Sequence, residues 1–416
     1  MADGQPKTLY LCYFWLDTPL VQTQVLPYLR GLVEGGLKVY LLTFERETLS
    51  PKEIEERKRK LADEGISWYF LRYHKTPSVP ATVFDVLNGA RFARRLAKKE
   101  GIDVFHGRVH IPMMMGWIAN RFLRRKPKLL FDIRGFFPDE YVDAGIWRRN
   151  SFAYKMVKYC ERLLLRDSDG FVTLTEKARG ILFPESKETG FDKDHRPVEV
   201  VPCCVDLARF EYATEENRAA MRAKLGVEDR LVIAYVGSFG GFYMTQETAD
   251  FYGVAKENNA KTFALILTQT PREMIEPLLK QLGFGKNDFF IGTVTPFEVP
   301  QYLSAADFAL SFIKPSYSKL ASSPTKNAEY LASGLPMVVN AGVGDTAEQV
   351  NEDKTGVVID EFSRESFETA VEEISRLLSD RQLIAKRCRE SARKRFDLHE
   401  VGGKRYLNVY RKLLRE

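Results

Sequence analysis

The sequence predicts an α/β protein with two doubly wound parallel sheets, one in each half of the chain. At 416 residues the chain is longer than a single hydrophobic core usually supports. Its composition, 44% hydrophobic and 28% charged, is typical of a folded globular protein. Short apolar runs alternate with amphipathic stretches almost from end to end, which is the pattern of parallel strands joined by helices.

The elements of the first half come from apolar, β-rich runs separated by helical periodicity. Amphipathic helices are predicted at Gln22–Gly35 and Phe152–Arg166. The predicted strands are Thr8–Phe14, Leu37–Phe44, Ser67–Arg72, Val104–His106, Leu129–Ile133, Gly170–Leu174 and Val198–Val201.

The pattern begins afresh after Phe210. The predicted strands there are Leu231–Val236, Phe263–Leu267, Phe289–Ile291, Phe308–Phe312, Met337–Asn340 and Gly356–Val358. Two lobes of this kind generally bind ligands in a cleft, at the loops that follow the carboxyl ends of their strands.

The boundary between the domains is predicted near Asp206–Arg209, because Pro202 stops a strand and the charged stretch Glu211–Arg222 follows as a surface helix. The first domain is then 1–205 and the second 206–397. The remaining segment, 398–416, carries a terminal helix with an apolar stripe of Tyr406, Val409, Tyr410 and Leu413. The first domain is the candidate surface for burying this stripe.

Charge is unevenly distributed along the chain. The net charge is +6, and residues 1–198 hold 34 Lys and Arg against 25 Asp and Glu, so the remainder is slightly acidic. A basic first half favours an anionic partner such as a membrane surface. Solvated helix faces are an equal alternative, since the run Arg91–Lys99 interleaves basic and apolar residues at helical spacing.

The five cysteines show neither metal-ligand spacing nor a disulfide framework, which predicts a reducing, cytoplasmic location. The apolar run Leu9–Leu16 is too short for a signal peptide core or a membrane span and is predicted to be a buried strand.

The most informative segment is Ser322–Pro336. Ser323 is a good N-cap and Pro324 fits the first helical position, so a helix is expected to begin there. The free N–H groups of its first turn, together with Lys326, form a candidate anion site. Glu329 lies about 7.5 Å along the helix axis from the start of the helix, within reach of the hydroxyls of a nucleotide whose diphosphate is bound there. The alternative is an ordinary capped helix in which Lys326 and Glu329 form a surface pair.

This segment, with its Ser-Pro-Thr-Lys turn and its helix Glu-Tyr-Leu-Ala-Ser-Gly-Leu-Pro, resembles the donor-binding motif of the GT-B glycosyltransferases of family 4. Val201–Phe210 resembles the interdomain segment of that family, and Gly292–Asp307 is similar to its base-binding loop. Leu20–Val39 matches the opening helix. The resemblance implies two Rossmann-like domains facing across a cleft, with the acceptor bound by the first and the nucleotide sugar by the second.

The family resemblance also implies an activity. The expected enzyme moves a hexose from a UDP or GDP sugar to a glycan or lipid-linked acceptor in polysaccharide biosynthesis, with no nucleic-acid partner. It would be cytoplasmic and peripheral on the inner face of the membrane. The alternatives are a sugar-nucleotide epimerase of similar two-lobe fold and a non-catalytic sugar-nucleotide-binding protein.

The donor-binding residues follow from the resemblance, position by position. Loops after the strands would line the phosphates, the base would meet the backbone of one loop, and the helix start would hold the diphosphate and the ribose. The set implied is Gly237, Ser238, Tyr243, Thr293, Val294, Thr295, Ser322, Ser323, Pro324, Thr325 and Glu329.

Two positions depart from the family pattern. Many members carry Arg and Lys after the first strand of the second lobe, and Gly237–Glu247 contains neither. Many also carry a second glutamate eight residues before the ribose-binding one, where this chain has Ala321. Lys326 and the helix N–H groups are therefore expected to carry more of the diphosphate charge.

The acceptor side is expected around Leu129–Glu140, which resembles the family's aspartate-x-arginine-glycine loop. Asp132 and Arg134 would position hydroxyls or the leaving diphosphate, and Asp139 or Glu140 would take a proton. With Lys326, the candidate catalytic residues are Asp132, Arg134 and Asp139. The alternative is an Asp–Arg pair that holds the loop.

Further acceptor-side candidates are Asp17, Thr18 and His110, each after a predicted strand. The first two could equally cap a helix, and a lone loop histidine is more often structural. No metal or other cofactor is expected. Asp167 and Asp169 spell the Asp-x-Asp of metal-dependent transferases, but they stand before a strand at a helix end, where they are expected to act as capping residues.

Overall fold

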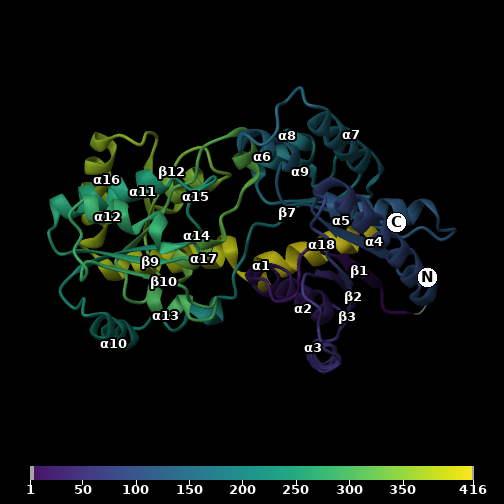
Figure 1. Cartoon of the computed structure of the whole chain (residues 1–416), viewed down its shortest axis with the longest axis horizontal. Coiled ribbons are helices and arrows are strands. Elements are labelled where there is room, and N and C mark those ends of the chain that lie inside the picture. The colour runs from purple at the N-terminus through teal and green to yellow at the C-terminus, as the bar shows by residue number, and fades with distance from the viewer. Residues whose placement is uncertain (1–3, 415–416) are drawn as a thin grey trace. The chain divides into compact units, whose positions relative to one another are not determined.

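The computed structural model describes residues 4–414 and divides into two compact units. The first comprises Met1–Pro202 with His399–Glu416, and the second comprises Cys203–Leu398 (Figure 1). The division falls just before the predicted boundary, because Cys203 donates its N–H to Ser323 Oγ (3.1 Å) and Val205 pairs with Asp397. The outermost residues of the predicted first domain and terminal segment, 1–3 and 415–416, lie outside the described residues.

The first unit is built on a parallel sheet of seven strands in the order β3-β2-β1-β4-β5-β6-β7. Its strands are β1 (Lys7–Leu11), β2 (Lys38–Glu45), β3 (Ile66–Arg72), β4 (Val104–Arg108), β5 (Lys128–Ile133), β6 (Gly170–Thr173) and β7 (Val198–Val200). Its helices are α1 (Pro19–Gln24), α2 (Leu26–Glu34), α3 (Pro51–Asp63), α4 (Ser78–Glu100), α5 (His110–Arg121), α6 (Phe137–Asp143), α7 (Phe152–Asp167), α8 (Glu176–Leu182), α9 (Ser186–Thr189) and α18 (Lys404–Leu414).

The second unit repeats this plan with six parallel strands in the order β10-β9-β8-β11-β12-β13. The strands are β8 (Leu231–Val236), β9 (Thr262–Leu267), β10 (Phe289–Gly292), β11 (Phe308–Ser311), β12 (Met337–Asn340) and β13 (Gly356–Ile359). The α-helices are α10 (Glu215–Leu225), α11 (Thr245–Asn258), α12 (Glu276–Gln281), α13 (Val299–Leu303), α14 (Thr325–Ala332), α15 (Thr346–Asp353), α16 (Arg364–Leu378) and α17 (Arg381–Phe396). Short 3-10 turns are η1 (Leu207–Phe210), η2 (Arg272–Met274) and η3 (Tyr317–Ala321), and the π-helical turn η4 (Leu398–Gly403) leads into α18.

Every predicted strand is present, with ends shifted by a few residues at most. Central strands of a parallel sheet are covered by helices on both faces, so their sequences are continuous apolar runs that stand out from their surroundings. The α/β class with two parallel sheets is thus confirmed.

Three predicted helices differ in the structure. Gln22–Gly35 is two helices, because Val25 leaves the helical conformation (φ −127°, ψ −65°) and Pro27 follows it in the first turn of α2. Glu211–Arg222 begins instead at Glu215, where Thr214 caps α10 by accepting from Asn217 N–H. The terminal helix starts at Lys404, after η4.

Helix α18 packs on the first unit, where it contacts α2, β6 and β7. The predicted stripe Tyr406, Val409, Tyr410 and Leu413 is fully buried there. The hydroxyl of Tyr410 lies 2.8 Å from Thr8 Oγ1 of β1 and 2.9 Å from His106 Nδ1 of β4. Helix α18 therefore completes the core of the first unit.

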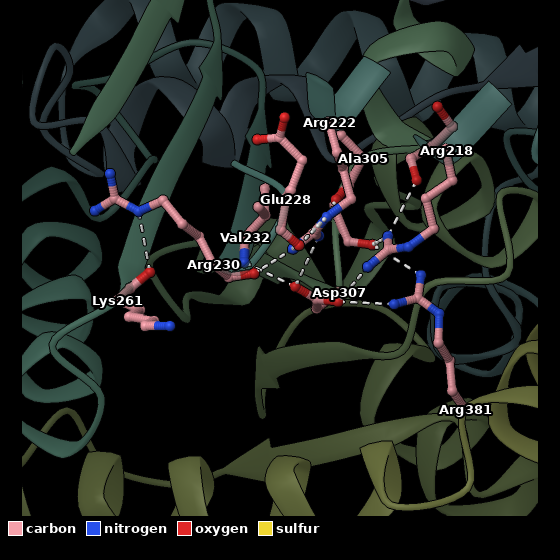
Figure 2. Close-up of polar contacts among 11 residues, drawn as sticks. Arg218, Arg222, Glu228, Arg230, Val232, Lys261, Ala305, Asp307 and Arg381 are labelled. Carbon is pink, nitrogen blue, oxygen red and sulfur yellow. Dashed lines mark hydrogen bonds and ion pairs between the residues drawn. The ribbon is translucent and has the colours of Figure 1, made fainter. Parts of the chain in front are cut away.

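At the amino ends of the second sheet, three arginines converge on one carboxylate (Figure 2). Arg218 and Arg381 bind Asp307 Oδ1 at 2.6 and 2.8 Å, and Arg222 lies 3.3 Å from Oδ2. Asp307 Oδ2 also accepts the N–H of Val232 (2.8 Å), and backbone carbonyls take further arginine N–H groups. Desolvation lowers the pKa of Arg218 to about 10. This arginine cluster, Arg218, Arg222, Arg381 and Asp307, ties α10 and α17 to the sheet.

Candidate active site

The segment with the strongest resemblance lies at the carboxyl edge of the second sheet. Gly237 follows β8 directly, and α14 begins nearby because Tyr330 of α14 accepts the N–H of Val236 (2.8 Å) and donates to Leu310 of β11 (3.2 Å). The start of α14 is thereby tied to two central strands. Ligands of parallel α/β sheets bind at this edge.

Lys326, in the first turn of α14, is a buried cation: only 7% of the residue is exposed. Among the described residues no hydrogen-bond partner reaches its Nζ. The ammonium lies 4.2 Å from the ring centroid of Tyr235 and 4.8 Å from that of Tyr243, so aromatic faces surround it in place of acceptors. Desolvation lowers its pKa to about 7, an effect that Glu329 opposes. A buried charge without a hydrogen bond is costly, which makes the position a candidate site for an anionic ligand.

Glu329 follows one turn later and is also buried. Desolvation raises its pKa to about 7, against the attraction of Arg209 and Lys326. Arg209 lies on η1, with its guanidinium 5.2 Å from the ring centroid of Phe297 and a hydrogen bond to the carbonyl of Pro296. The second unit therefore brings two cations and one carboxylate together at the start of α14, rather than the surface Lys326–Glu329 pair of the alternative.

The start of α14 differs from the prediction by one residue. Pro324 is the N-cap and Thr325 the first helical residue, whereas Ser323 was expected to cap the helix. The hydroxyl of Ser323 is used elsewhere, because it accepts the N–H of Cys203. Ser322 precedes it in extended conformation. The first-turn N–H groups of α14 receive no side-chain cap, and such groups suit an anion.

The loop after β8 is shaped by glycine. Gly237 adopts φ +135°, and a Cβ there would lie 3.2 Å from Lys326 Nζ, so a side chain would fill the space beside the ammonium. Ser238 is exposed at this turn and accepts the hydroxyl of Tyr235 through its carbonyl (2.6 Å). Gly240 accepts the N–H of Tyr243 (3.0 Å), which places that ring over Lys326.

The predicted base-binding loop follows β10. Thr293 is exposed and its hydroxyl donates to Thr268 (2.8 Å), while Val294 packs against the core. Thr295 was expected to offer its backbone to a base. Its N–H instead donates to Glu298 Oε2 (2.8 Å) in a capping turn ahead of α13. The N–H of Thr295 is therefore already engaged within the loop.

On the first unit, Asp17 and Thr18 lie in the loop after β1. Thr18 caps α1 by accepting the N–H of Val21 (3.3 Å), as in the structural alternative, and Asp17 pairs with Arg57 (2.7 Å). Glu45 stabilises the same loop by accepting the N–H of Leu16 (3.0 Å). Thr18 is thus assigned a structural role.

Asp132 does not open into a ligand site. It is fully buried, accepts the hydroxyl of Tyr406 from α18 (2.9 Å), and has Arg108 at 3.7 Å and Arg134 at 3.8 Å. These charges outweigh desolvation and lower its pKa to about 2. The expectation that Asp132 positions an acceptor is therefore replaced by the alternative, an Asp–Arg pair that holds the loop. Arg134 has a further partner in the carbonyl of Val201 (3.5 Å).

Asp139 is likewise buried and neutralised. Its carboxylate binds Lys158 (2.8 Å) and accepts the hydroxyl of Tyr154 (3.0 Å), both from α7. Because Asp139 is buried with these partners, Glu140 remains the candidate base of this turn. The ring of His110 stacks on Phe137 at 5.3 Å and its Nε2 lies 3.0 Å from Glu161, so the histidine joins the loops after β4 and β5.

The Asp-x-Asp pair turns away from this edge. Asp167 accepts from Trp117 (2.8 Å) and Arg121 (2.8 Å), and Asp169 accepts the N–H of Leu129 (2.8 Å) at the beginning of β5. Between residues 4 and 414, no group of three or more His, Cys, Asp or Glu side chains is arranged to hold a metal ion.

Two family models match the chain, one on each half. Residues 21–209 match the model described as Glycosyltransferase Family 4, and residues 217–395 match Glycosyl transferases group 1. The chain belongs to the group 1, family 4-like glycosyltransferases of the GT-B fold. Transfer is therefore favoured over epimerisation and over binding without catalysis.

Solved structures show the fold of this glycosyltransferase at low sequence identity. A glycosyltransferase from Rickettsia africae has a TM-score of 0.70 and 15% identity, with 99% of this chain and 100% of that chain covered. Sucrose-phosphate synthase from Thermosynechococcus elongatus has a TM-score of 0.69 and 15% identity, with 99% of this chain and 100% of that chain covered. Anabaena HepE in complex with UDP-glucose has a TM-score of 0.68 and 13% identity, with 97% of this chain and 99% of that chain covered. No sequence among curated proteins matches significantly.

Three residues near the candidate site of the glycosyltransferase were not predicted from the sequence. Arg209 lies within the segment Val201–Phe210, but its proximity to Glu329 depends on tertiary packing. Tyr235 is part of an apolar strand and reads as core, yet its ring faces Lys326. Lys319, on η3, places its ammonium 3.8 Å from the ring of Phe242. A cation thus reaches the loop after β8 from another segment, in a chain whose own loop lacks Arg and Lys.

Proposed function

We propose that this glycosyltransferase moves a hexose from a nucleoside-diphosphate sugar, carried on UDP or GDP, to a glycan or lipid-linked acceptor in surface polysaccharide biosynthesis. One observation carries the donor assignment: the buried ammonium of Lys326 lies at a helix start that has no side-chain cap, and no acceptor among residues 4–414 reaches it. A diphosphate supplies the acceptors that this position lacks. The complex of the similar HepE with UDP-glucose supports a donor of this class.

The chemistry expected of this site is stabilisation of the departing diphosphate. As the sugar develops oxocarbenium character, negative charge grows on the phosphates, and preorganised N–H groups of α14 and the ammonium of Lys326 stabilise it. The carboxylate of Glu329 accepts ribose hydroxyls. We propose that these groups suffice without a metal ion, and that Glu140 takes the proton of the acceptor.

A thermal-shift screen against UDP, GDP, ADP and dTDP sugars tests the donor, since a ligand of the folded state raises its stability. The expected result is stabilisation by one nucleotide class, lost in Lys326→Ala and kept in Lys261→Ala. Lys261 is an exposed lysine of the same unit, so it controls for charge. Equal shifts in the two variants would remove the support for this site.

Transfer is tested by following the donor with and without acceptor glycans. Nucleoside diphosphate released only when acceptor is present, at the same rate in the presence of a chelator, is expected from metal-independent transfer of the sugar to the acceptor. Epimerised free donor would contradict the proposal, and loss of activity with the chelator would contradict its metal independence.

We further propose that the enzyme is cytoplasmic and peripheral on the inner face of the membrane, where lipid-linked acceptors reside. Within the described part of the chain, no helix has both the length and the apolar character to cross a bilayer.

A further inference from the structure

Helix α4 has an outward face that changes from apolar to basic along its length. Val79, Val83, Phe84 and Leu87 are each more than half exposed, which is unusual for four large apolar residues within nine positions. One to three turns later the exposed residues of the same face are Arg91, Arg94, Arg95 and Lys98. At about 100° per residue, all eight fall within a sector of about 160°.

Helix α7 has the same character. Phe152 is 80% exposed and Tyr159 60%, and Met156 lies between them one turn from each. Lys155, Arg162 and Arg166 are exposed along the same stripe. Aromatic and basic side chains therefore alternate on the solvent side of this helix.

These two faces belong to one surface of the first unit. Helix α5 contacts both α4 and α7, so the three helices pack side by side (Figure 1). Just after α5, Phe122 is 63% exposed under the guanidinium of Arg94, at 5.7 Å from its ring centroid. Exposed Arg124, Arg125 and Lys126 follow. We call this surface, the outward side chains of α4 and α7 with residues 122–126, the basic-apolar face.

Helices α4 and α7, which form the basic-apolar face, and helix α5 between them carry no exposed carboxylate. Asp85 of α4 is buried and holds Tyr13 (2.7 Å) and His74. Glu161 of α7 is buried against His110. The acidic residues at the helix ends, Glu100 and Asp167, are partly buried and engaged by Tyr40 and by Trp117. Of the cations of the face, Arg166 pairs with Asp167 (2.6 Å) and Arg125 with Asp103. For its other exposed arginines and lysines the described residues show no ion pair, so most of the positive charge is not neutralised from within.

We propose that the basic-apolar face docks on an anionic lipid bilayer, with Phe84, Leu87, Phe152 and Tyr159 entering the interface and the arginines and lysines binding headgroup phosphates. The inference deepens the proposed function and rests on it for the presence of a membrane. Scattered apolar side chains among cations on adjacent helices suit the interfacial region of a bilayer. A second copy of the chain would bring like charges together, which disfavours self-association through this face.

Vesicle flotation of the full chain tests this directly. The protein is expected to float with vesicles of phosphatidylcholine and phosphatidylglycerol, and not with phosphatidylcholine alone. F84S/L87S should weaken binding by about tenfold or more through lost apolar insertion. R91E/R95E should weaken it similarly, and high salt should abolish the remaining binding.

The matched control is L383S/R393E on α17 of the second unit, which alters an apolar and a basic residue that are similarly exposed. It is expected to float like the wild type. Wild-type protein that ignores anionic vesicles, or face variants that float like the control, would overturn the proposal. So would face variants that abolish a dimer in analytical ultracentrifugation and leave flotation unchanged.

Nucleotide-sugar thermal shift on the same variants separates the two proposals. Retained donor binding with lost flotation is the expected result. Lost donor binding in Lys326→Ala with normal flotation confirms that the readouts are independent. A wild type that floats but binds no nucleotide sugar would contradict the proposed function and leave the docking surface standing.

Discussion

The second unit buries charge in two contrasting ways. In the arginine cluster at the amino ends of the strands, Asp307 receives three guanidinium groups and a backbone N–H, and backbone carbonyls satisfy further donors. At the carboxyl ends, Lys326 is buried with aromatic rings around it and no acceptor among the described residues. At one edge of this sheet the buried charges are satisfied by ion pairs and hydrogen bonds, and at the other edge a buried ammonium has no hydrogen-bond acceptor among the described residues.

The difference separates a structural role from a binding role. The charges of the arginine cluster are paired with one another and fix the positions of α10 and α17, so they do not call for a ligand. The buried ammonium without a hydrogen bond and the raised pKa of Glu329 indicate a destabilising site in the empty enzyme, and we propose that the donor diphosphate relieves it. Substitutions in the two places should therefore change stability in opposite directions.

The largest expected effect is in the arginine cluster. D307A leaves three arginines without their carboxylate and should lower the free energy of unfolding by about 3–5 kcal/mol. Denaturant unfolding measures this, and donor affinity of the fraction that remains folded should be unchanged. Folded D307A protein that no longer binds the nucleotide sugar would contradict this division into a structural and a binding role.

Lys326 should behave in the reverse manner. K326M removes the main cation opposite the diphosphate and is expected to weaken donor binding by roughly 100-fold. The same change should raise the melting temperature of the empty enzyme by several degrees, because a buried charge without a hydrogen bond is replaced by an apolar chain. Calorimetric titration and thermal unfolding test the two parts separately, and a destabilised K326M would show that the ammonium is compensated after all.

The contrast between these regions also explains what the sequence could predict. Parallel strands are continuous apolar runs, so the sequence predicts all of them. The helix that carries Lys326 is predicted from the proline before it and the glycine after it. The helix break at Val25 was missed because the apolar periodicity continues across it, although Pro27 stands where a new helix begins. The cap of α14 was misplaced because the hydroxyl of Ser323 serves Cys203, which is distant in the sequence.

The acceptor-side residues were the least predictable. Asp132 follows a buried run and stands beside Arg134, which suggested a reactive loop, but its partner Tyr406 comes from the far end of the chain. Asp139 is neutralised by Lys158, whose direction depends on how α7 packs. Local patterns identify where a charged residue stands in an element, and only tertiary packing decides whether that charge is satisfied.

Glu329 offers a smaller test of the donor site. E329Q keeps the shape of the side chain and removes the carboxylate that we assign to the ribose hydroxyls, so donor affinity should fall by about tenfold. Ribose and 2′-deoxyribose nucleotides compared by titration give the decisive control. The wild type should prefer ribose and E329Q should not, and an unchanged preference would detach Glu329 from the sugar.

The smallest expected effect is a pH dependence of stability in the empty enzyme. Lys326 has a pKa of about 7 when folded and 10.5 ordinarily, so between those values the unfolded chain holds the extra proton and stability rises with pH. Glu329 has a pKa of about 7 when folded and 4.5 ordinarily, so between those values the folded chain holds the extra proton and stability falls as pH rises. Together the two groups give a minimum near pH 7, with slopes of at most about 1.4 kcal/mol per pH unit on either side. Denaturant unfolding from about pH 5 to about pH 9 should show this dip in the wild type relative to K326M/E329Q. A bound diphosphate restores a charged Lys326 and should make the alkaline side of the dip shallower, whereas a dip that persists in the double variant would assign it to other groups.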